Sequence, residues 1–418
     1  MNINSKIEEV LTRGVEHIYP SRKELENALV SGKKLRIYYG IDPTGKLHVG
    51  HVVGLRKMRQ LQDLGHEIII LIGDFTATIG DPTGKGTARK PLSRKQVLAN
   101  AKDYKKQIGK IVDLKKSNVR FLHNEKWSGK LKPEDLLGLA SQFTVAGLLE
   151  RDMFQERIKA GKEIYVHEFL YPIFQAYDSA TMNVDLEVGG NDQIFNMLAG
   201  RTLLKKLRDK EKFVLALKLL TDPSGKKMGK SEGNMVNLDE NPNSMFGKVM
   251  SWPDELIAIG FELLTDISLR SVELMKERFG RTIQGDMLEF EPIAEELRVN
   301  LDARTLNRDL KQKLAFEIVK QCHGEKIAKA AEEEFVKVFR EKKQPEAILE
   351  VHLGIKEMSL LELLVSVKFA ESKSDARRLV EQGGVKIDDI LQTDPNQAVS
   401  LKEGMVIQAG PHRFIRIA

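Results

Sequence analysis

The sequence predicts an α/β protein that begins with a doubly wound, parallel-sheet domain, continues with an α-helical domain and ends in a small α+β domain. Residues 35–41 alternate in polarity like a strand, and an apolar helical pattern at residues 52–61 follows them. Residues 67–72 are almost continuously apolar, which is typical of a strand buried on both faces of a parallel sheet. This strand–helix–strand order favours a ligand crevice at the carboxyl ends of the strands.

Changes in pattern divide the chain into four segments. The α/β domain is expected at residues 1–241, and charged and apolar residues at helical spacing predict a helical domain at 242–341. Residues 342–357 are irregular and read as a linker. Residues 358–418 carry two short helical patterns followed by short alternating segments, and we expect a separate small domain there.

The charge of the chain permits a polyanionic partner without proving one. The chain has 418 residues, and its 66 Lys and Arg against 60 Asp and Glu give a net charge of +6. Eleven of the cations fall within residues 85–116, which contain only two acids. This imbalance favours contact with RNA phosphates, and a solvated helix face is the alternative interpretation.

Cysteine usage and hydropathy favour a cytoplasmic protein. The single cysteine, Cys322, excludes an internal disulfide and any zinc site with several cysteines. We expect no secretory signal, because the first residues lack a cationic start followed by an apolar run. The apolar run at 68–72 is far too short to span a bilayer, so no membrane association is expected.

The turn after the first predicted strand is a candidate binding site. His48 and His51 stand where that strand leads into a helix, and at this spacing they point the same way. A helix N-terminus has unpaired N–H groups and positive dipole character, which favour phosphate, and Gly50 lets a flat ligand approach the backbone. Two histidines so spaced are also common as an incidental surface pair or a weak metal pair, so the interpretation needs a second motif.

A lysine-rich segment far downstream supplies that second motif. Residues 226–231 read Lys-Lys-Met-Gly-Lys-Ser, and they follow residues 221–225, Thr-Asp-Pro-Ser-Gly. This composition is typical of a loop, and alone it usually marks a solvated turn. Its cations can act with the histidines only if the fold brings the two segments together.

A polar stripe lies on another expected helix. Tyr171, Gln175 and Asp178 are four and three residues apart, so they share one helix face and form a candidate specificity wall. The alternative is a group of satisfied polar side chains at a helix edge. An alternating strand at 184–188 then runs into the Gly-Gly pair at 189–190, which permits close approach of a ligand.

The histidine and lysine motifs together resemble the paired signature of the class I aminoacyl-tRNA synthetases, whose catalytic domain is Rossmann-like. Residues 48–51, His-Val-Gly-His, are similar to the HIGH motif, and residues 227–231, Lys-Met-Gly-Lys-Ser, are similar to the KMSKS motif. Val49 stands in place of isoleucine, which changes little. Gly229 stands in place of serine, which removes a hydroxyl but keeps both lysines.

Other segments resemble the tyrosyl-tRNA synthetases of the bacterial kind, so that the resemblance covers nearly the whole chain. They are residues 38–44, 171–178 and 189–193, together with a tail similar to an S4 RNA-binding domain. A tryptophan-specific synthetase is the nearest alternative, but such enzymes typically lack the S4 tail and the Tyr-Gln-Asp helix. A non-catalytic RNA-binding protein on a synthetase scaffold is the other alternative, and the intact histidines and lysines argue against it.

The resemblance implies roles in a tyrosine pocket. Tyr38 and Asp178 would hydrogen-bond the phenolic hydroxyl of the substrate. The residues that would hold its α-ammonium are Asp81, Tyr171 and Gln175. The remaining contacts to the amino acid and to the ribose side would come from Thr76, Asp192 and Gln193.

The resemblance also implies sites for ATP and RNA. The ATP site would comprise Gly40, Asp42, His48, Gly50, His51, Gly190, Asp192 and Lys230. Charge on the reacting phosphates would be stabilised by His48, His51, Lys227 and Lys230, with Ser231 and Thr44 as supporting donors. The phosphate contacts of the S4-like tail would be Lys368, Lys373, Arg377 and Arg378.

The reaction implied by this family has two steps. L-Tyrosine reacts with ATP to give tyrosyl-adenylate and pyrophosphate, and the tyrosyl group then passes to the 3′ end of tRNA(Tyr). Because the attacking carboxylate is already ionised, the first step needs positioning and electrostatics rather than a protein base. Mg²⁺ would accompany ATP, but no dedicated protein metal site can be recognised in the sequence. The apolar helices expected at 132–160 would form the interface of a homodimer.

Overall fold

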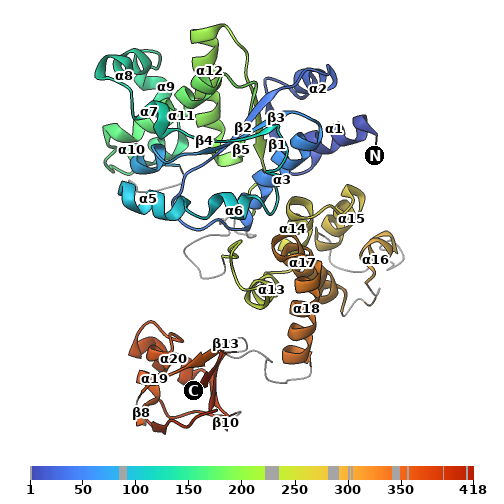
Figure 1. The fold of residues 1–418 in the computed structure, drawn as a ribbon, viewed down its shortest axis with the longest axis vertical. Helices are drawn as coiled ribbons and strands as arrows, with labels where there is room; N and C mark the ends of the chain where they lie inside the picture. The colour runs from blue at the N-terminus through green and yellow to red at the C-terminus, as the bar shows by residue number, and fades with distance from the viewer. Residues whose placement is uncertain are drawn as a thin grey trace.

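Three parts follow one another along the longest dimension of the molecule (Figure 1). They are an α/β domain at the N-terminus, a helical domain in the middle and a small sheet domain at the C-terminus. Among the residues described, none of the helices combines the length and apolar character needed to cross a bilayer. The computed structural model describes residues 2–83, 92–221, 235–280, 291–299, 302, 305–340, 349–354, 357–388, 390–410 and 413–418.

The sheet of the N-terminal domain confirms the doubly wound topology. Its order is β1-β6-β5-β2-β3-β4, with β1 antiparallel to β6 and all other neighbours parallel. The chain moves from β2 towards β4 in one direction and from β5 to β6 in the other, so the switch point lies between β2 and β5. The strands are β1 (Val15–Tyr19), β2 (Arg36–Ile41), β3 (Glu67–Ile72), β4 (Val119–His123), β5 (Leu186–Gly190) and β6 (Phe213–Leu217).

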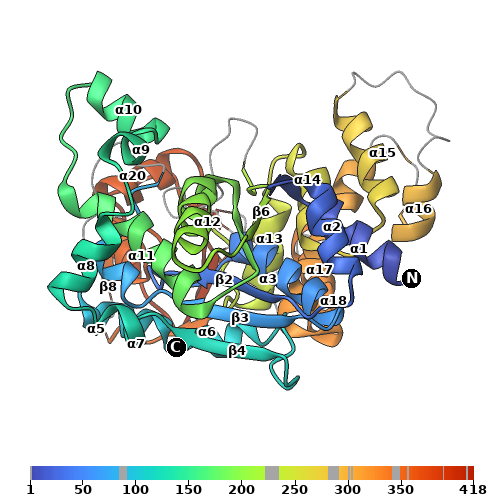
Figure 2. The ribbon, with the colours of Figure 1, turned by 90° about the horizontal axis from the view of Figure 1, so that it is seen from above.

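Helices cover both faces of this sheet, as the apolar strands require. Ile68 and Ile70 pack into the core cluster that contains α3, whereas Ile69 and Leu71 pack on the opposite face against the end of α11. Figure 2 shows α8, α9 and α10 at the end of the domain away from α1 and α2. The helices are α1 (Ile3–Thr12), α2 (Arg22–Val30), α3 (Val49–Asp63), α4 (Thr76–Ile79), α5 (Arg94–Ala101), α6 (Tyr104–Ile108), α7 (Glu125–Ser128), α8 (Pro133–Ala140), α9 (Val145–Leu149), α10 (Asp152–Lys159), α11 (Val166–Met182) and α12 (Ile194–Arg208), with a 3₁₀ turn η1 (Asn191–Gln193).

The helical domain packs onto the α/β domain through a shared apolar core. One cluster of buried side chains runs from Ile7 in α1, through Leu55 in α3, to Phe261 in α14 and Leu314 in α17. Because these residues exclude water together, the two domains are a single packed unit. The helices are α13 (Pro242–Met250), α14 (Leu256–Leu264), α15 (Leu269–Gly280), α16 (Glu291–Leu297), α17 (Leu306–His323) and α18 (Glu325–Arg340).

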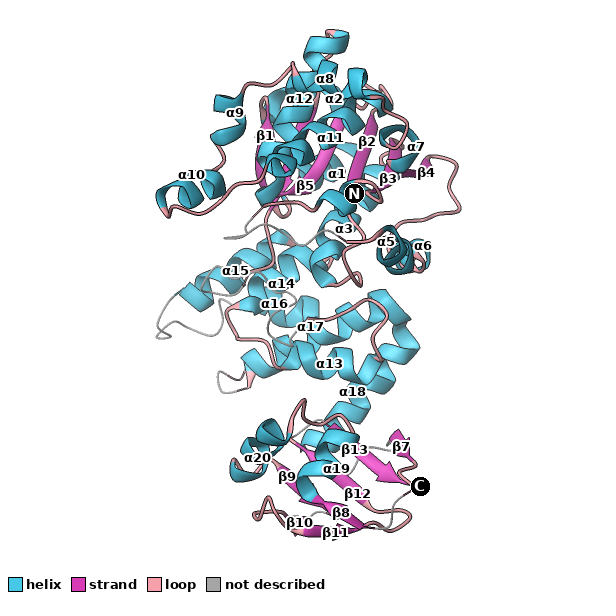
Figure 3. Ribbon diagram, turned by 90° about the vertical axis from the view of Figure 1, so that its left-hand side faces the viewer, coloured by secondary structure: helices cyan, strands magenta, loops and turns pink. Residues whose placement is uncertain are grey.

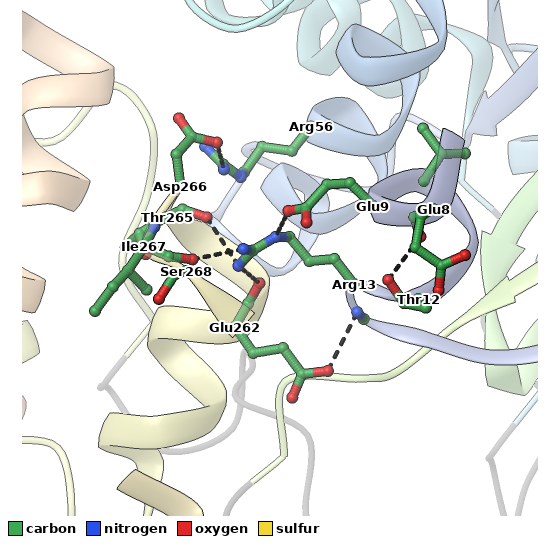
Figure 4. A network of polar contacts seen from close by, with 12 residues as sticks. Glu8, Glu9, Thr12, Arg13, Arg56, Glu262, Thr265, Asp266, Ile267 and Ser268 are labelled. Carbon is green, nitrogen blue, oxygen red and sulfur yellow. Dashed lines mark hydrogen bonds and ion pairs between the residues drawn. The ribbon is translucent and has the colours of Figure 1, made fainter. Parts of the chain in front are cut away.

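A buried arginine fastens the end of α14 to the N-terminal segment (Figure 4). The guanidinium of Arg13 donates to the carbonyl oxygens of Glu262 at 3.2 Å and Ile267 at 2.5 Å. The carboxylate of Glu262 in turn accepts from the backbone N–H of Gly14 at 3.2 Å and from Lys218 at 2.9 Å. Arg13 therefore satisfies carbonyl groups at the end of a helix that has no further turn to accept their hydrogen bonds.

The C-terminal domain has its own sheet and its own core. The sheet order is β10-β9-β12-β13-β7, and β8 pairs separately with β11 (Figure 3). The core lies between this sheet and the helices α19 and α20. The elements are β7 (Leu349–Val351), β8 (Glu357–Ser359), α19 (Leu360–Ser366), α20 (Lys373–Glu381), β9 (Val385–Ile387), β10 (Ile390–Leu391), β11 (Ala398–Ser400), β12 (Val406–Ala409) and β13 (Arg413–Ile417).

Two short strands lie where the sequence predicts none. The segment before residue 35, where the sequence pattern predicts no strand, contains β1, which forms the antiparallel edge of the first sheet, and the expected linker at 342–357 contains β7, which pairs in parallel with β13. Both strands are brief, so neither gives a period long enough to recognise. The C-terminal sheet therefore includes residues that precede position 358.

Candidate active site

A cavity of about 300 Å³ opens at the carboxyl ends of β2 and β5, at the switch point of the sheet. It collects residues from both sides of that point and from α3, α4 and α11. Every residue predicted for tyrosine or ATP that the structure describes lines it. They are Tyr38, Gly40, Asp42, Thr44, His48, Gly50, His51, Thr76, Asp81, Tyr171, Gln175, Asp178, Gly190, Asp192 and Gln193.

The two histidines form the cap of α3. The N–H of Gly50 donates to Nδ1 of His48 at 3.2 Å, and the N–H of His48 donates to Nδ1 of His51 at 3.2 Å. Because each Nδ1 accepts, the neutral rings carry their proton on Nε2. The ring centroids are 4.1 Å apart, and a Cβ on Gly50 would come within 3.0 Å of the His48 ring. The glycine is therefore needed for this cap as well as for access.

The segment after the lysine-rich motif is bonded to the histidine turn. The N–H of Val49 donates to the carbonyl of Val236, and the N–H of Leu238 donates to the carbonyl of Leu47, both at 3.0 Å. On the other side, residues 218–220 line the cavity. Lys227, Lys230 and Ser231 lie outside the described residues; the described flank before them lines the cavity, and the flank after them is bonded to the turn that carries the histidines.

A buried carboxyl forms the end of the slot. Asp178 accepts from the indole N–H of Trp127 at 2.7 Å and from the amide of Asn124 at 3.1 Å. Burial raises the pKa of Asp178 to about 8, although these two hydrogen bonds act in the opposite direction. Sequence reasoning missed both donors. Asn124 follows directly on β4, and that position at a strand end was the available signal.

The Tyr38 hydroxyl is also engaged. It lies 3.1 Å from the hydroxyl of Ser179, and the side chain is only 1% exposed. Burial raises the pKa of Tyr38 well above that of a free phenol, so the ring stays neutral at physiological pH. Tyr38 and Asp178 thus approach the same slot with protein partners of their own.

Asp42 joins the residues predicted for ATP to those predicted for tyrosine. Its carboxylate accepts from the hydroxyl of Tyr171 at 2.9 Å and from the hydroxyl of Thr76 at 2.7 Å. Asp81, further along the wall, accepts from the amide of Gln193 at 2.8 Å. The cavity consequently offers several anchored carboxylates to a cationic group.

Two further buried residues were missed by sequence reasoning. The amide of Gln175 donates to Glu187 of β5 at 2.9 Å, and Glu187 is paired with Lys212. Both charges are almost fully buried. The alternation of residues 184–188 could have shown that Glu187 faces the same side of the sheet as Tyr38, its neighbour across β2 and β5.

The residues predicted to contact RNA lie together in the C-terminal domain and are exposed. Lys368 follows α19, and Arg377 in α20 donates to Asn396 at 2.9 Å. Lys373 pairs with Glu362 at 2.8 Å, and Arg378 pairs loosely with Asp375 at 3.4 Å. Exposed pairs of this kind are weak, so a phosphate can compete for these cations.

The described residues contain no group of three or more His, Cys, Asp or Glu side chains arranged to hold a metal ion. Carboxyl groups around the cavity instead accept hydrogen bonds from protein donors. Asp42 accepts from the hydroxyls of Thr76 and Tyr171, and Asp178 accepts from the indole of Trp127.

Comparison with known proteins decides the family. The model of the class I tRNA synthetases for tryptophan and tyrosine matches residues 31–340, and the S4 domain model matches residues 358–407. A tyrosine–tRNA ligase from Carboxydothermus hydrogenoformans is 40% identical to the chain, over 98% of the chain and 97% of the relative. One from Thermotoga maritima is 41% identical over 98% of the chain and 96% of the relative.

The chain belongs to the tyrosine–tRNA ligase family.

Solved structures of this family share the fold. A truncated mitochondrial tyrosyl-tRNA synthetase from Aspergillus nidulans superposes with a TM-score of 0.63 at 21% identity, covering 80% of this chain and 94% of its own. A tyrosyl-tRNA synthetase from Archaeoglobus fulgidus, solved in complex with L-tyrosine, has a TM-score of 0.57 at 23% identity, covering 79% of this chain and all of its own. The similarity to tyrosyl-tRNA synthetases expected from the sequence is thus confirmed.

Proposed function

We propose that this protein, a tyrosine–tRNA ligase, activates L-tyrosine with ATP in the switch-point cavity and then transfers the tyrosyl group to the 3′ end of tRNA(Tyr). The observation that carries the proposal is the convergence on one cavity of the described residues predicted for tyrosine and ATP. The slot that ends at Asp178 offers polar groups to a phenol, and the imidazoles that cap α3 offer their Nε2–H groups to phosphates.

The phenol end supplies the specificity for tyrosine. Asp178 and Tyr38 hydrogen-bond the hydroxyl of the substrate from two sides of the slot. A phenylalanine ring there would leave both polar groups without that partner in a site removed from water, which is unfavourable.

The opposite end of the amino acid is held by charge. Asp81, Tyr171 and Gln175 surround the α-ammonium, and Thr76, Asp192 and Gln193 complete the contacts to the amino acid and the ribose. Asp42 supports the arrangement, because its two oxygens hold the hydroxyls of Tyr171 and Thr76. The substrate is thus oriented with its carboxylate towards the histidine turn.

Catalysis of adenylate formation is electrostatic. The carboxylate of tyrosine attacks the α-phosphorus of ATP, and pyrophosphate leaves with its charge stabilised by His48 and His51, with Thr44 as a supporting donor. Lys227, Lys230 and Ser231 would act on the same charges, as the family resemblance implies, and residues 218–220, which precede their segment, line the cavity. Gly40, Gly50 and Gly190 admit the nucleotide, and Mg²⁺ enters as its complex with ATP.

The C-terminal domain binds tRNA. It carries Lys368, Lys373, Arg377 and Arg378 as phosphate contacts and matches the S4 domain model. The basic residues of α5 and α6 add a second cationic surface close to the cavity, because Asn100 and Tyr104 bond the backbone at Pro43 and Gly45.

We further propose a homodimer in the cytoplasm. Within residues 132–160, the part of the chain expected to form the interface, Leu137 is 71% and Val145 is 70% exposed, and Val166, just beyond it, is 77% exposed. Burial of these side chains against a second copy removes apolar surface from water.

ATP–pyrophosphate exchange with tyrosine and with tryptophan, run side by side, tests the function. We expect exchange that depends on tyrosine and is at least a hundredfold weaker with tryptophan. Exchange that prefers tryptophan would overturn the substrate assignment, and no exchange with either amino acid would overturn the catalytic role.

A further inference from the structure

A buried ion pair lies beneath the cavity, and none of the roles above uses it. Glu187 in β5 is 2% exposed, and Lys212, just before β6, is fully buried. Lys212 contacts Oε2 of Glu187 and also donates to the hydroxyl of Ser179 at 3.0 Å. Apolar side chains of similar volume often stabilise a core as well as a buried ion pair does, so packing alone does not account for this pair.

The second oxygen of Glu187 faces the tyrosine pocket. Oε1 accepts from Nε2 of Gln175 at 2.9 Å, while Oε2 is held by Lys212. A carboxylate oxygen can only accept, so the carboxamide of Gln175 must turn its NH₂ group towards Glu187. The carbonyl oxygen of the same amide is then the atom that Gln175 can offer to a ligand in the cavity, which this residue lines.

We propose that Glu187, anchored by Lys212, is a positioning residue that fixes the Gln175 carboxamide with its carbonyl oxygen towards the α-ammonium of tyrosine. An ammonium group has three donors and no acceptor, so it binds the carbonyl end of an amide and is repelled by the NH₂ end. The inference deepens the proposed function, because it rests on Gln175 contacting that ammonium. It assigns to Glu187, which borders the cavity beside Gln175, the choice between two amide orientations of nearly equal shape.

Lys212 helps to preserve this orientation of the Gln175 amide. Burial lowers the pKa of Lys212, and the neighbouring Glu187 carboxylate counteracts the effect. Tyr38 from β2, Asp178 from α11 and Arg201 from α12 are the other titratable or charged groups that face the pair. Wherever the shared proton lies between Lys212 and Oε2, Oε1 remains an acceptor, so the orientation of Gln175 is kept.

The variant Glu187→Gln tests the proposal with almost no change in shape. Lys212 keeps its bond to the carbonyl oxygen at position 187, so the new NH₂ group faces Gln175 and turns that amide over. We expect the KM for tyrosine in ATP–pyrophosphate exchange to rise at least tenfold, with the KM for ATP within twofold of its original value. An unchanged KM for tyrosine, or equal rises for both substrates, would overturn the proposal.

Exchanging the two side chains should restore binding. In Gln175→Glu combined with Glu187→Gln, the carboxylate at 175 accepts from the amide at 187 and offers its second oxygen to the ammonium, and the charge of the site is conserved. We expect a KM for tyrosine within threefold of wild type. Failure of this double variant to improve on the single variant would contradict the mechanism.

Two inhibitors separate the ammonium contact from the phenol contact. Tyramine keeps the ammonium, whereas 3-(4-hydroxyphenyl)propanoate lacks it. Glu187→Gln should weaken inhibition by tyramine at least tenfold and inhibition by the propanoate less than threefold, and equal weakening would overturn the proposal. If the single variant does not fold, the exchanged pair decides, because it must keep at least the wild-type preference for tyramine.

Glu168→Gln is the matched control. Glu168 is as deeply buried as Glu187, is paired with Arg157 at 2.6 Å and lies on α11, but it does not line the cavity. We expect its loss to lower the melting temperature without moving the KM for tyrosine, and a rise equal to that of Glu187→Gln would contradict the assignment. A wild-type protein without tyrosine-dependent exchange would instead defeat the proposed function itself, which keeps the two failures distinguishable.

Discussion

The α/β and helical domains share one core, whereas the C-terminal domain has a core of its own. The first core joins side chains from Ile7 to Ala331, and the second is confined to residues between Leu360 and Ile417. A shared core makes two domains unfold together, and a separate one permits independent folding. The difference indicates that the cavity belongs to a unit with one shared core, to which the S4 domain is joined as a part with a core of its own.

Removal of the C-terminal domain is the strongest way to test this contrast. We expect a chain that ends at residue 341 to lose about a thousandfold in tRNA charging, about 4 kcal/mol, because the proposed phosphate contacts at 368–378 are gone. Tyrosine-dependent pyrophosphate exchange should stay within twofold of the full chain, since the cavity lies entirely in the shared unit. Loss of exchange in the shortened chain would show that the two cores are not independent.

Arg13→Met should destabilise the shared unit at the junction of its domains. Arg13 is 5% exposed and bonds carbonyl groups at the end of α14, so its loss leaves them unsatisfied and should cost about 3 kcal/mol of unfolding free energy. The two tryptophans report on the two halves, because Trp127 lies in the α/β domain and Trp252 in the helical domain.

In the Trp127→Phe and Trp252→Phe variants, urea unfolding followed by tryptophan fluorescence and by far-ultraviolet circular dichroism should therefore give coincident midpoints within each variant, with and without Arg13→Met. Separate midpoints in the background that keeps Arg13 would contradict a shared core. Lys276→Met is a control for the loss of a cation from the same network, since Lys276 is partly exposed.

A buried lysine gives the shared unit a pH dependence of its own. Lys57 in α3 donates to the carbonyls of Val10 and Arg13 at 2.7 and 3.0 Å, and burial lowers its pKa from 10.5 to about 7. Between these values the unfolded chain binds more protons than the native one, so the unfolding free energy should rise with pH, by up to about 1.4 kcal/mol per unit. Lys57→Met should remove this rise between pH 7 and 9.

The titration of Asp178 should change the unfolding free energy in the opposite direction, over a lower range of pH. Its pKa is raised from 3.8 to about 8, so between these values the native state holds the extra proton and stability falls as pH rises. In the original protein the slope of that fall should be about 1 kcal/mol per pH unit or less, because other groups titrate in the same range. Asp178→Asn should abolish the fall. It should also remove an inflection near pH 8 from kcat/KM for tyrosine.

Much of the fold and site could be predicted because local pattern carries it. The strands around 35–41 and 67–72 have clear periods, and Tyr171, Gln175 and Asp178 share a helix face whose direction geometry fixes. The partners of these side chains were not predictable. Trp127 reaches Asp178 from 51 positions away, and such a pairing depends on tertiary packing that no local pattern encodes.

The same limit explains the remaining differences. Strands of three to five residues such as β1 and β7 are defined by their neighbours, β6 and β13, more than by their own residues. Glu187 and Lys212 would be assigned to the surface by composition alone, and only the fold shows that they compensate each other in the interior.

Helix α3 is anchored near its middle as well as capped at its start. One end begins at His48, and Lys57 is anchored on the backbone at the end of α1. A shift of the two imidazoles along the helix axis would therefore also displace the first dozen residues of the chain, to which Lys57 is bonded. We expect that trimming or rigidly tagging that leading segment, which does not line the cavity, would shift the imidazoles of His48 and His51 relative to the cavity.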